Sequence, residues 1–212
     1  MVLTENAPSA ARSAVKVLAA AGVRSLPVDP TELARHFGVK MVDYSTFSRT
    51  YGIPIVELYA HSKYGFGFYE GDGYVCAVNE NACGGIRRRW TAAHELGHYF
   101  LGHISEDRRA ERSADAERQA DAFAAELLAP LLVLHFCAVS SAEELARLCL
   151  ISQTAARIRF EELCGSRRAA AKALHQNGFS GALSLDSPEN MALLSGFAPF
   201  TAREQLKKYN AT

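Results

Sequence analysis

The residues whose chemistry is clearest lie together near the middle of the chain. His94 and His98 are four residues apart and Glu95 directly follows the first of them, which is the His-Glu-x-x-His pattern. Positions four apart share one face of a helix, so both imidazoles can reach one ion. Zinc accepts neutral imidazole nitrogens, and a catalytic zinc has three protein ligands and an open position for water. The pattern predicts a zinc site with Glu95 as the general base. The alternative is a surface or packed helix that carries two histidines by chance.

Two acidic residues further along the chain offer a third ligand. Glu117 and Asp121 are four residues apart in the next helical stretch, so their carboxylates share a face. We assign Glu117 to the metal, because two histidines leave a catalytic zinc one protein ligand short. Asp121 is expected to accept the other ring N–H of His94 and so to set its tautomer. The alternative for Asp121 is an ordinary exposed carboxylate. The other nearby acids are expected to be solvated or in salt bridges: Glu106, Asp107, Glu111, Asp115 and Glu126.

His103 tests a longer version of the zinc motif. That version requires glycine seven residues and histidine ten residues after the first histidine. In this chain Gly102 and His103 follow His94 by eight and nine residues, so the longer motif is broken. We expect His103 to lie at the end of its helix, near the backbone carbonyls.

The elements that must position these residues are two helices and a small sheet. Apolar spacing predicts helices over 86–101 and 113–128, and Pro130 ends the second. Upstream, helices are expected over 9–21 and 31–37, and strands over 39–44, 55–60, 64–69 and 74–78. The segment from Glu70 to Gly73 has turn residues and predicts an antiparallel hairpin between the last two strands. The fold class is therefore α+β, with a small mixed or antiparallel sheet packed on the active-site helices.

The carboxy-terminal part of the chain is expected to be helical. Helices are predicted over 142–149, 153–164 and 167–174, followed by a tail that mixes glycine, serine and proline with one short amphipathic helix near 202–208. We divide the chain into a metal-site domain over 1–134, a helical region over 135–178 and a tail over 179–212. The segment 145–159 resembles a helix-turn-helix that would offer Gln153, Arg157 and Arg159 to a DNA groove, but Leu150 replaces the usual turn glycine. Packing or docking of a protein is the favoured interpretation.

Composition limits the classes of partner. The 212 residues are 49% hydrophobic, as in an ordinary folded protein, and 23 lysines and arginines balance 23 acids. A neutral chain has no overall field for nucleic acid, so direct DNA binding is not expected. No leader sequence and no run of about 20 apolar residues is visible, so we expect a cytoplasmic protein without a membrane span. The five cysteines form no Cys-x-x-Cys pair and are expected to be buried free thiols.

Three segments together resemble the ImmA/IrrE family of metallopeptidases: 77–81 (AVNEN), 88–103 (RRWTAAHELGHYFLGH) and 117–130 (ERQADAFAAELLAP). The resemblance extends over about residues 9–130. It implies a zincin-like fold, a zinc-dependent endopeptidase activity, and a cytoplasmic helix-turn-helix repressor as the substrate. Cleavage would then relieve repression in a phage, a mobile element or a stress response. The resemblance supports metal binding by His94, His98 and Glu117, and catalysis by Glu95.

The sequence leaves a second function possible. The rival function is a catalytically silent, zinc-containing regulatory module that binds a repressor or DNA. Glu95 argues against it, because metal retention alone requires no general base. The strand over 74–78 precedes the motif helix, so we expect its exposed edge to align an extended substrate by strand addition. The sequence leaves the oligomeric state undetermined.

Overall fold

The computed structural model describes residues 7–82, 84–103, 113–174 and 183–210. Cys83, Glu106, Asp107 and Glu111 therefore lie outside the described residues. Contacts divide the chain into unit 1, Met1–Ala14 with Asp29–Ala124, and unit 2, Val15–Val28 with Ala125–Thr212. The boundary falls inside two helices, α1 (Ala7–Ala20) and α6 (Ala114–Leu128). The division at residues 134 and 178 stays a prediction.

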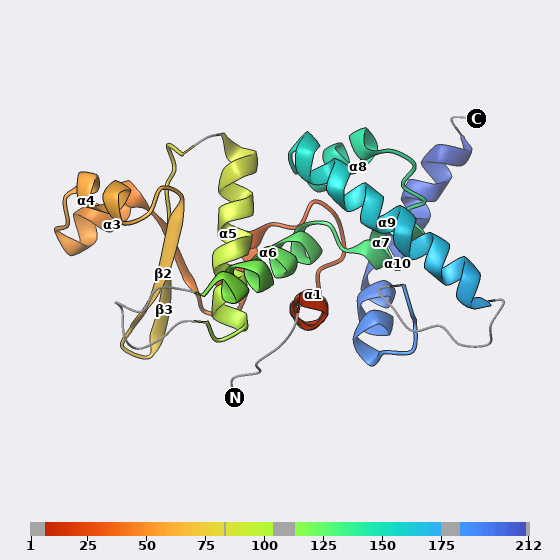
Figure 1. Ribbon diagram of the computed structural model, residues 1–212, viewed down its shortest axis with the longest axis horizontal. Coiled ribbons are helices and arrows are strands. Elements are labelled where there is room, and N and C mark those ends of the chain that lie inside the picture. The colour runs from red at the N-terminus through yellow and green to blue at the C-terminus, as the bar shows by residue number, and fades with distance from the viewer. Residues whose placement is uncertain (1–6, 83, 104–112, 175–182, 211–212) are drawn as a thin grey trace. The chain divides into compact units, whose positions relative to one another are not determined.

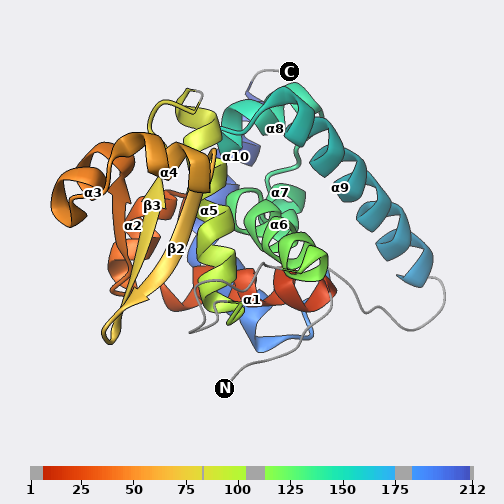
Figure 2. The same cartoon turned by 60° about the vertical axis from the view of Figure 1, so that its left-hand side comes forward.

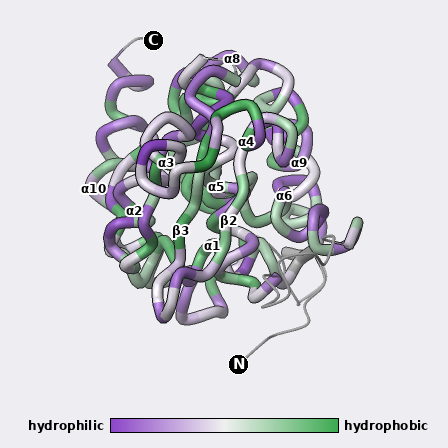
Figure 3. Tube along the Cα trace, turned by 90° about the vertical axis from the view of Figure 1, so that its left-hand side faces the viewer, coloured by the Kyte–Doolittle hydropathy of each residue, from purple (hydrophilic) through white to green (hydrophobic). Residues whose placement is uncertain are grey.

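The sheet of unit 1 has three strands, β1 (Lys40–Asp43), β2 (Gly65–Glu70) and β3 (Gly73–Val78). Their order is β1-β3-β2, with β3 parallel to β1 and antiparallel to β2. The turn between β2 and β3 begins at Gly71, whose φ of 57° lies in the left-handed region that glycine adopts without strain. The hairpin and the small mixed sheet predicted from the sequence are confirmed. Figure 3 shows hydrophobic residues along β3, as expected for a middle strand.

The two faces of β2 differ because phenylalanine alternates with glycine along it. Phe66 and Phe68 pack against a cluster formed by α3 (Tyr44–Tyr51), α4 (Ile55–His61) and Ala77 of β3. Gly65 and Gly67 point to the opposite face, where α5 (Gly85–Phe100) packs on the sheet. Figures 1 and 2 show α3 and α4 on one side of the strands and α5 on the other. The absence of a side chain at Gly65 allows α5 to approach the sheet closely, and its absence at Gly67 leaves room for the Tyr74 ring.

The strand expected over 55–60 is wrong, because this segment forms α4. Its apolar run is too short for periodicity to separate a buried strand from a helix. Glu57 in the first turn and His61 in the last turn complement the helix dipole, which favours the helix. Only Leu58 of this helix is buried, whereas 67% of Val56 is exposed.

The other helices predicted before Pro130 are confirmed to within two residues. The segment expected over 31–37 is α2 (Pro30–His36), which begins with proline at its first position. Asp29 caps it by accepting the Thr31 N–H at 2.8 Å. The remaining three are α1, α5 and α6.

Unit 2 contains α7 (Leu131–Phe136), α8 (Ala142–Cys149), α9 (Gln153–Leu174) and α10 (Pro188–Tyr209). The separate helix expected over 167–174 is wrong, because α9 continues through Gly165 without a break. The tail was also misjudged, because α10 replaces the short helix expected near 202–208. Ser187 caps α10 through the Asn190 N–H, and Pro188 occupies its first turn. Leu193, Phe197 and Phe200 are buried, so this helix contributes to the core of unit 2.

One apolar stretch within the described residues, Ala114–Phe136, is long enough to cross a membrane by length and composition. It spans α6 and α7 and is interrupted at Pro130. Because 72% of its apolar window is buried in the protein, a core segment is favoured over a membrane span.

Candidate metal centre

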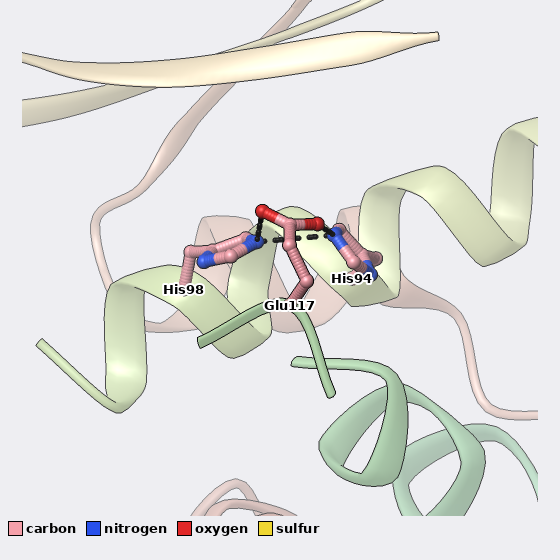
Figure 4. Close-up of side chains that lie close together, drawn as sticks. All are labelled: His94, His98 and Glu117. Atoms are coloured by element: carbon pink, nitrogen blue, oxygen red, sulfur yellow. Dashed lines mark hydrogen bonds and ion pairs between the residues drawn. The ribbon is translucent and has the colours of Figure 1, made fainter. Parts of the chain in front are cut away.

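The three residues predicted to bind metal lie together in unit 1. His94 and His98 project from the same face of α5, and Glu117 projects from the first turn of α6. Figure 4 shows the Glu117 carboxylate pointing toward both rings. His94 Nε2 lies 3.0 Å from His98 Nε2 and 3.2 Å from Glu117 Oε2, and His98 Nε2 lies 3.3 Å from Glu117 Oε1. Among the described residues, these three side chains form the group whose donor atoms lie close enough together to hold one metal ion.

The chemistry and spacing of these donors fit zinc. Ligands bound tetrahedrally at about 2.0 to 2.1 Å from zinc are separated from one another by roughly 3.3 Å. The observed separations of 3.0 to 3.3 Å are close to that value. Two neutral imidazoles and one carboxylate form the three-protein-ligand set of a catalytic zinc site, with the fourth position open to water.

Asp121, which the sequence predicts to accept a ring N–H of His94, lies beside that ring. His94 Nδ1 lies 2.9 Å from Asp121 Oδ1, so the ring N–H is donated to the carboxylate and Nε2 faces the other ligands. Burial acts to lower the pKa of His94, but the hydrogen bond to Asp121 and the charges of Glu95, Asp121 and Glu117 outweigh it. The pKa of His94 is therefore raised above its usual value, because three carboxylates surround its ring.

A close contact between α5 and α6 sets the reach of Glu117. A Cβ atom on Gly97 would lie 3.1 Å from both the Cα and the carbonyl oxygen of Ala120 and 3.3 Å from Phe123 Cβ. Glycine at position 97 and alanine at position 120 thus let the two helix backbones pass near each other. Phe100 and Phe123 stack at a centroid distance of 5.8 Å beside this contact. The glycine inside the motif is therefore part of the site's geometry.

Glu95 lies between α5 and the sheet and is only 3% exposed. A Cβ atom on Gly65 would lie 3.6 Å from Glu95 Cγ and 2.7 Å from Thr91 Cγ2, so β2 passes directly over this part of the helix. The charge of Glu95 is among the causes that raise the pKa of His94, which places its carboxylate within electrostatic reach of that ring. A carboxylate held within electrostatic reach of His94 is suited to accept a proton from water.

His103 lies just beyond the end of α5, and its backbone N–H donates to the His98 carbonyl at 3.0 Å, as expected of a helix-terminal histidine. The sequence did not predict the contacts of its ring, which include the side chains of His98 and Gln119. His103 Nδ1 lies 3.2 Å from His98 Nδ1, and His103 Nε2 lies 3.0 Å from Gln119 Oε1. Gln119 was not identified as a site residue from the sequence. The spacing gave no signal for it, because Gln119 lies two residues after Glu117 and positions two apart do not share a helix face.

Two of the remaining acids can be placed. Asp115 forms a salt bridge with Arg118 at 2.9 Å, as expected. Glu126 belongs to unit 2, where it is 5% exposed and pairs with Arg159. It is therefore a buried structural partner of an arginine.

The strand expected to present an open edge to the substrate is β3, and this expectation is wrong. Among the described residues β3 is the middle strand, hydrogen-bonded to β1 on one side and to β2 on the other. The strand that lies over Glu95 is β2, which is an edge strand of the described sheet. Chain order alone suggested β3, because it directly precedes the motif helix.

The helix-turn-helix resemblance is confirmed only as local geometry. The chain turns between α8 and α9 at Leu150, a non-glycine residue with φ of 52°. Gln153 and Arg157 are exposed on α9, but Arg159 is 7% exposed and pairs with Glu126. Arg159 is therefore unable to contact a DNA groove, and the expectation for this residue is wrong.

The described cysteines are free thiols, as predicted. Cys76, Cys137 and Cys149 are buried and Cys164 is partly buried. Burial is the main cause that raises the pKa of Cys137 to about 12, so this thiol is not ionised at neutral pH.

Comparison with known proteins identifies a family match over residues 49–157, which is slightly more than half of the chain. The matching family is Peptidase_M78, described as the IrrE N-terminal-like domain. The matched residues include all three proposed metal ligands, Glu95 and the α8–α9 turn. The match begins at residue 49, well after the start of the resemblance at about residue 9. No curated protein matches the chain.

Proposed function

The chain belongs to the Peptidase_M78 family, and on this premise we propose that it is a zinc-dependent endopeptidase. The observation that carries the proposal is the arrangement of two imidazoles and the Glu117 carboxylate around one position, with buried Glu95 beside them. His94, His98 and Glu117 would hold the ion. Bound zinc supplies Lewis-acid polarisation of a scissile carbonyl and acidifies water.

Residues of the protein transfer the proton, orient a metal ligand and exclude water. Glu95 accepts the proton of the attacking water and then delivers it to the leaving amine, so no covalent intermediate with the enzyme is required. Asp121 keeps the His94 ring in the orientation that presents Nε2 to the site. The close passage of β2 over Glu95 shields its carboxylate from bulk water.

The substrate we propose is a cytoplasmic transcriptional repressor with a helix-turn-helix, cleaved at one peptide bond so that repression is relieved. Support comes from the resemblance of the segments around residues 77–130 to the ImmA/IrrE family and from the family match. The balance of 23 basic and 23 acidic residues favours a protein partner over nucleic acid. A regulatory role implies selective cleavage, in contrast to general protein degradation.

The alternative is a zinc-containing module that binds its partner without cleaving it. The burial of Glu95 argues against this function, because a buried carboxylate is costly and metal retention does not require it. A silent module would tolerate an apolar residue at this position.

The test compares the wild-type chain with Glu95→Gln, using zinc-loaded protein and candidate repressors encoded near its own gene. The amide keeps the shape of the side chain but accepts no proton, so we expect unchanged zinc content and a turnover reduced by roughly 10²- to 10⁴-fold. Fragments identified by mass spectrometry would locate the cleaved bond. The control is Glu57→Gln, since Glu57 is exposed on α4.

Near-normal cleavage by Glu95→Gln would remove this residue from the mechanism. Zinc-loaded wild-type protein that binds the repressor but leaves it intact would support the silent module instead.

A further inference from the structure

The second metal-site histidine has a partner on its other ring nitrogen, and that partner is His103. Metal-bound histidines generally donate their second ring N–H to an acceptor, which sets the tautomer and the ring orientation. Asp121 has this role for His94. For His98, whose side chain is fully buried, the atom at that position is Nδ1 of His103, at 3.2 Å.

The backbone brings His103 to this position. After α5 ends, Gly102 adopts a left-handed conformation with φ of 70°. The Gly102 N–H then bonds to the Tyr99 carbonyl at 3.2 Å and the His103 N–H to the His98 carbonyl at 3.0 Å. These two bonds form a Schellman motif, which reverses the chain at the helix end. The reversal returns the imidazole of His103 to the ring of His98.

The hydrogen-bond partners of Gln119 determine which nitrogen carries each proton. Gln119 Nε2 donates to Asp115 Oδ2 at 2.8 Å, and Asp115 Oδ1 pairs with Arg118. The amide is therefore oriented with its oxygen toward His103 Nε2, because the reverse orientation would set that oxygen against a carboxylate. His103 Nε2 must carry a proton to bond to the amide oxygen. In a neutral imidazole His103 Nδ1 is then an acceptor.

We propose that His103 is a positioning residue of the metal centre, which acts by accepting the Nδ1–H of His98. This interaction holds His98 in the tautomer whose Nε2 lone pair faces His94 and Glu117. The chain of donors runs from His98 through His103 and Gln119 to Asp115, and it links α5 to α6 a second time. The inference rests on the proposed zinc function, since it assigns the supporting partner of one zinc ligand.

The first measurement requires no metal. Long-range proton–nitrogen NMR spectra of the metal-free protein, labelled with ¹⁵N-histidine, distinguish the two neutral tautomers at about pH 8, above the usual imidazole pKa. We expect His98 to carry its proton on Nδ1 and His103 on Nε2. A His98 ring protonated on Nε2 would overturn the assignment.

The second measurement is the zinc dissociation constant, obtained by competition with a chelator. His103→Phe keeps a ring but removes the acceptor, so zinc binding should weaken by roughly 10- to 100-fold. His103→Gln should recover most of the loss, because its amide oxygen accepts from His98 and its amide nitrogen donates to Gln119. His36→Phe is the control, because His36 is exposed in the last turn of α2.

Wild-type affinity in His103→Phe, or equal losses in the Phe and Gln variants, would show that His103 does not act through this hydrogen bond. Two zinc ions per chain would contradict the proposal, because His98 and His103 would then be ligands of a second ion. If His103→Phe does not fold, Gln119→Leu tests the same series of hydrogen bonds. Unchanged tautomers together with unchanged zinc affinity in that variant would contradict the proposal. A wild-type protein that binds no zinc refutes the proposed function, whereas the tautomer measurement still decides the role of His103.

Discussion

Glu117 is the predicted ligand that comes from a different helix than the two histidines. Its two carboxylate oxygens lie 3.2 and 3.3 Å from the Nε2 atoms of His94 and His98. Residue type and helical spacing were sufficient to propose this trio, because imidazoles four apart need a third donor from another element. They were insufficient for His103, whose partners depend on how the chain reverses after α5.

Glu117→Ala should weaken zinc binding more than the roughly 10- to 100-fold loss expected for residues that only support a ligand. The physical reason is that the variant leaves two protein ligands for an ion that requires three. The measurement is a chelator competition, with Glu143→Ala on the exposed side of α8 as the control. Unchanged affinity in Glu117→Ala would exclude this residue from the site.

At the scale of elements, small residues decide how closely the helices and strands approach. Gly65 lets β2 pass over Glu95, and Gly97 lets α6 pass near α5. The alternation of glycine and phenylalanine along β2 separates the face that packs on α5 from the face that packs on α3 and α4. These contacts convert a local motif into a three-dimensional site.

Gly97→Ala should destabilise the protein and weaken zinc binding. The added Cβ would meet the Ala120 backbone at 3.1 Å, and overpacking of this kind typically costs about 1 to 3 kcal/mol. Alanine gains back about 1 kcal/mol of helix propensity, so the net loss is smaller than the overpacking cost. Displacement of α6 also moves Glu117, which lowers zinc affinity. Denaturant unfolding and chelator competition measure the two effects.

Gly165→Ala is the matched control, because Gly165 also lies inside a helix but a Cβ there meets only an arginine nitrogen at 4.0 Å. This variant should gain about 0.5 to 1 kcal/mol in unfolding free energy and bind zinc normally. Equal effects of the two substitutions would show that the contact at Gly97 does not position Glu117.

Glu80 stabilises the start of α3 in a pH-dependent way. Its carboxylate accepts the N–H groups of Tyr44 and Ser45 at 3.0 and 3.1 Å, and also the Ser45 hydroxyl. Burial acts to raise the pKa of Glu80, but these hydrogen bonds outweigh it and lower the pKa below 4.5. The stabilisation is therefore complete above pH 4.5 and is lost as the pH falls through the lowered pKa of the folded state.

Glu80→Gln should reduce the free energy of unfolding by about 1 kcal/mol at neutral pH, a typical value for loss of a helix cap. The gap between wild type and variant should shrink as the pH falls below 4.5, because protonated Glu80 resembles the amide. Urea unfolding over a series of pH values measures it. A gap that stays constant down to pH 3 would show that the charge of Glu80 is irrelevant.

At the scale of the whole molecule, the carboxy-terminal half has a core of its own. Leu163 of α9 and Leu193, Phe197 and Phe200 of α10 are buried in unit 2. An ion pair between Arg159 and Glu126 lies within this unit, and Arg159 Nε also donates to the Ala129 carbonyl at 2.8 Å. The final segment is therefore a structural part of unit 2, in contrast to the tail with one short helix that was expected from its composition.

Arg159→Ala should destabilise the protein by about 3 to 5 kcal/mol, because it leaves Glu126 buried without its partner charge. Arg157→Ala, two residues earlier on the same helix but exposed, should change stability by no more than about 0.5 kcal/mol. Denaturant unfolding compares the two variants. A loss below about 1 kcal/mol for Arg159→Ala would show that Glu126 is neutralised in another way.

The sequence alone was sufficient to predict that His94, His98 and Glu117 lie together, and to predict the hairpin and the helices that carry these residues. The hairpin and the helices depend on contacts between near neighbours in the chain, and the trio was inferred because a catalytic zinc requires three protein ligands. Tertiary structure decided the features that depend on distant partners. In the structure, residues 55–60 form a helix and β3 is the middle strand of the described sheet. Arg159 is buried against Glu126, and α10 is longer than the helix expected near 202–208. Short apolar runs and charged side chains have no unique structure in isolation, because the element that packs against them determines whether they are buried, paired or exposed.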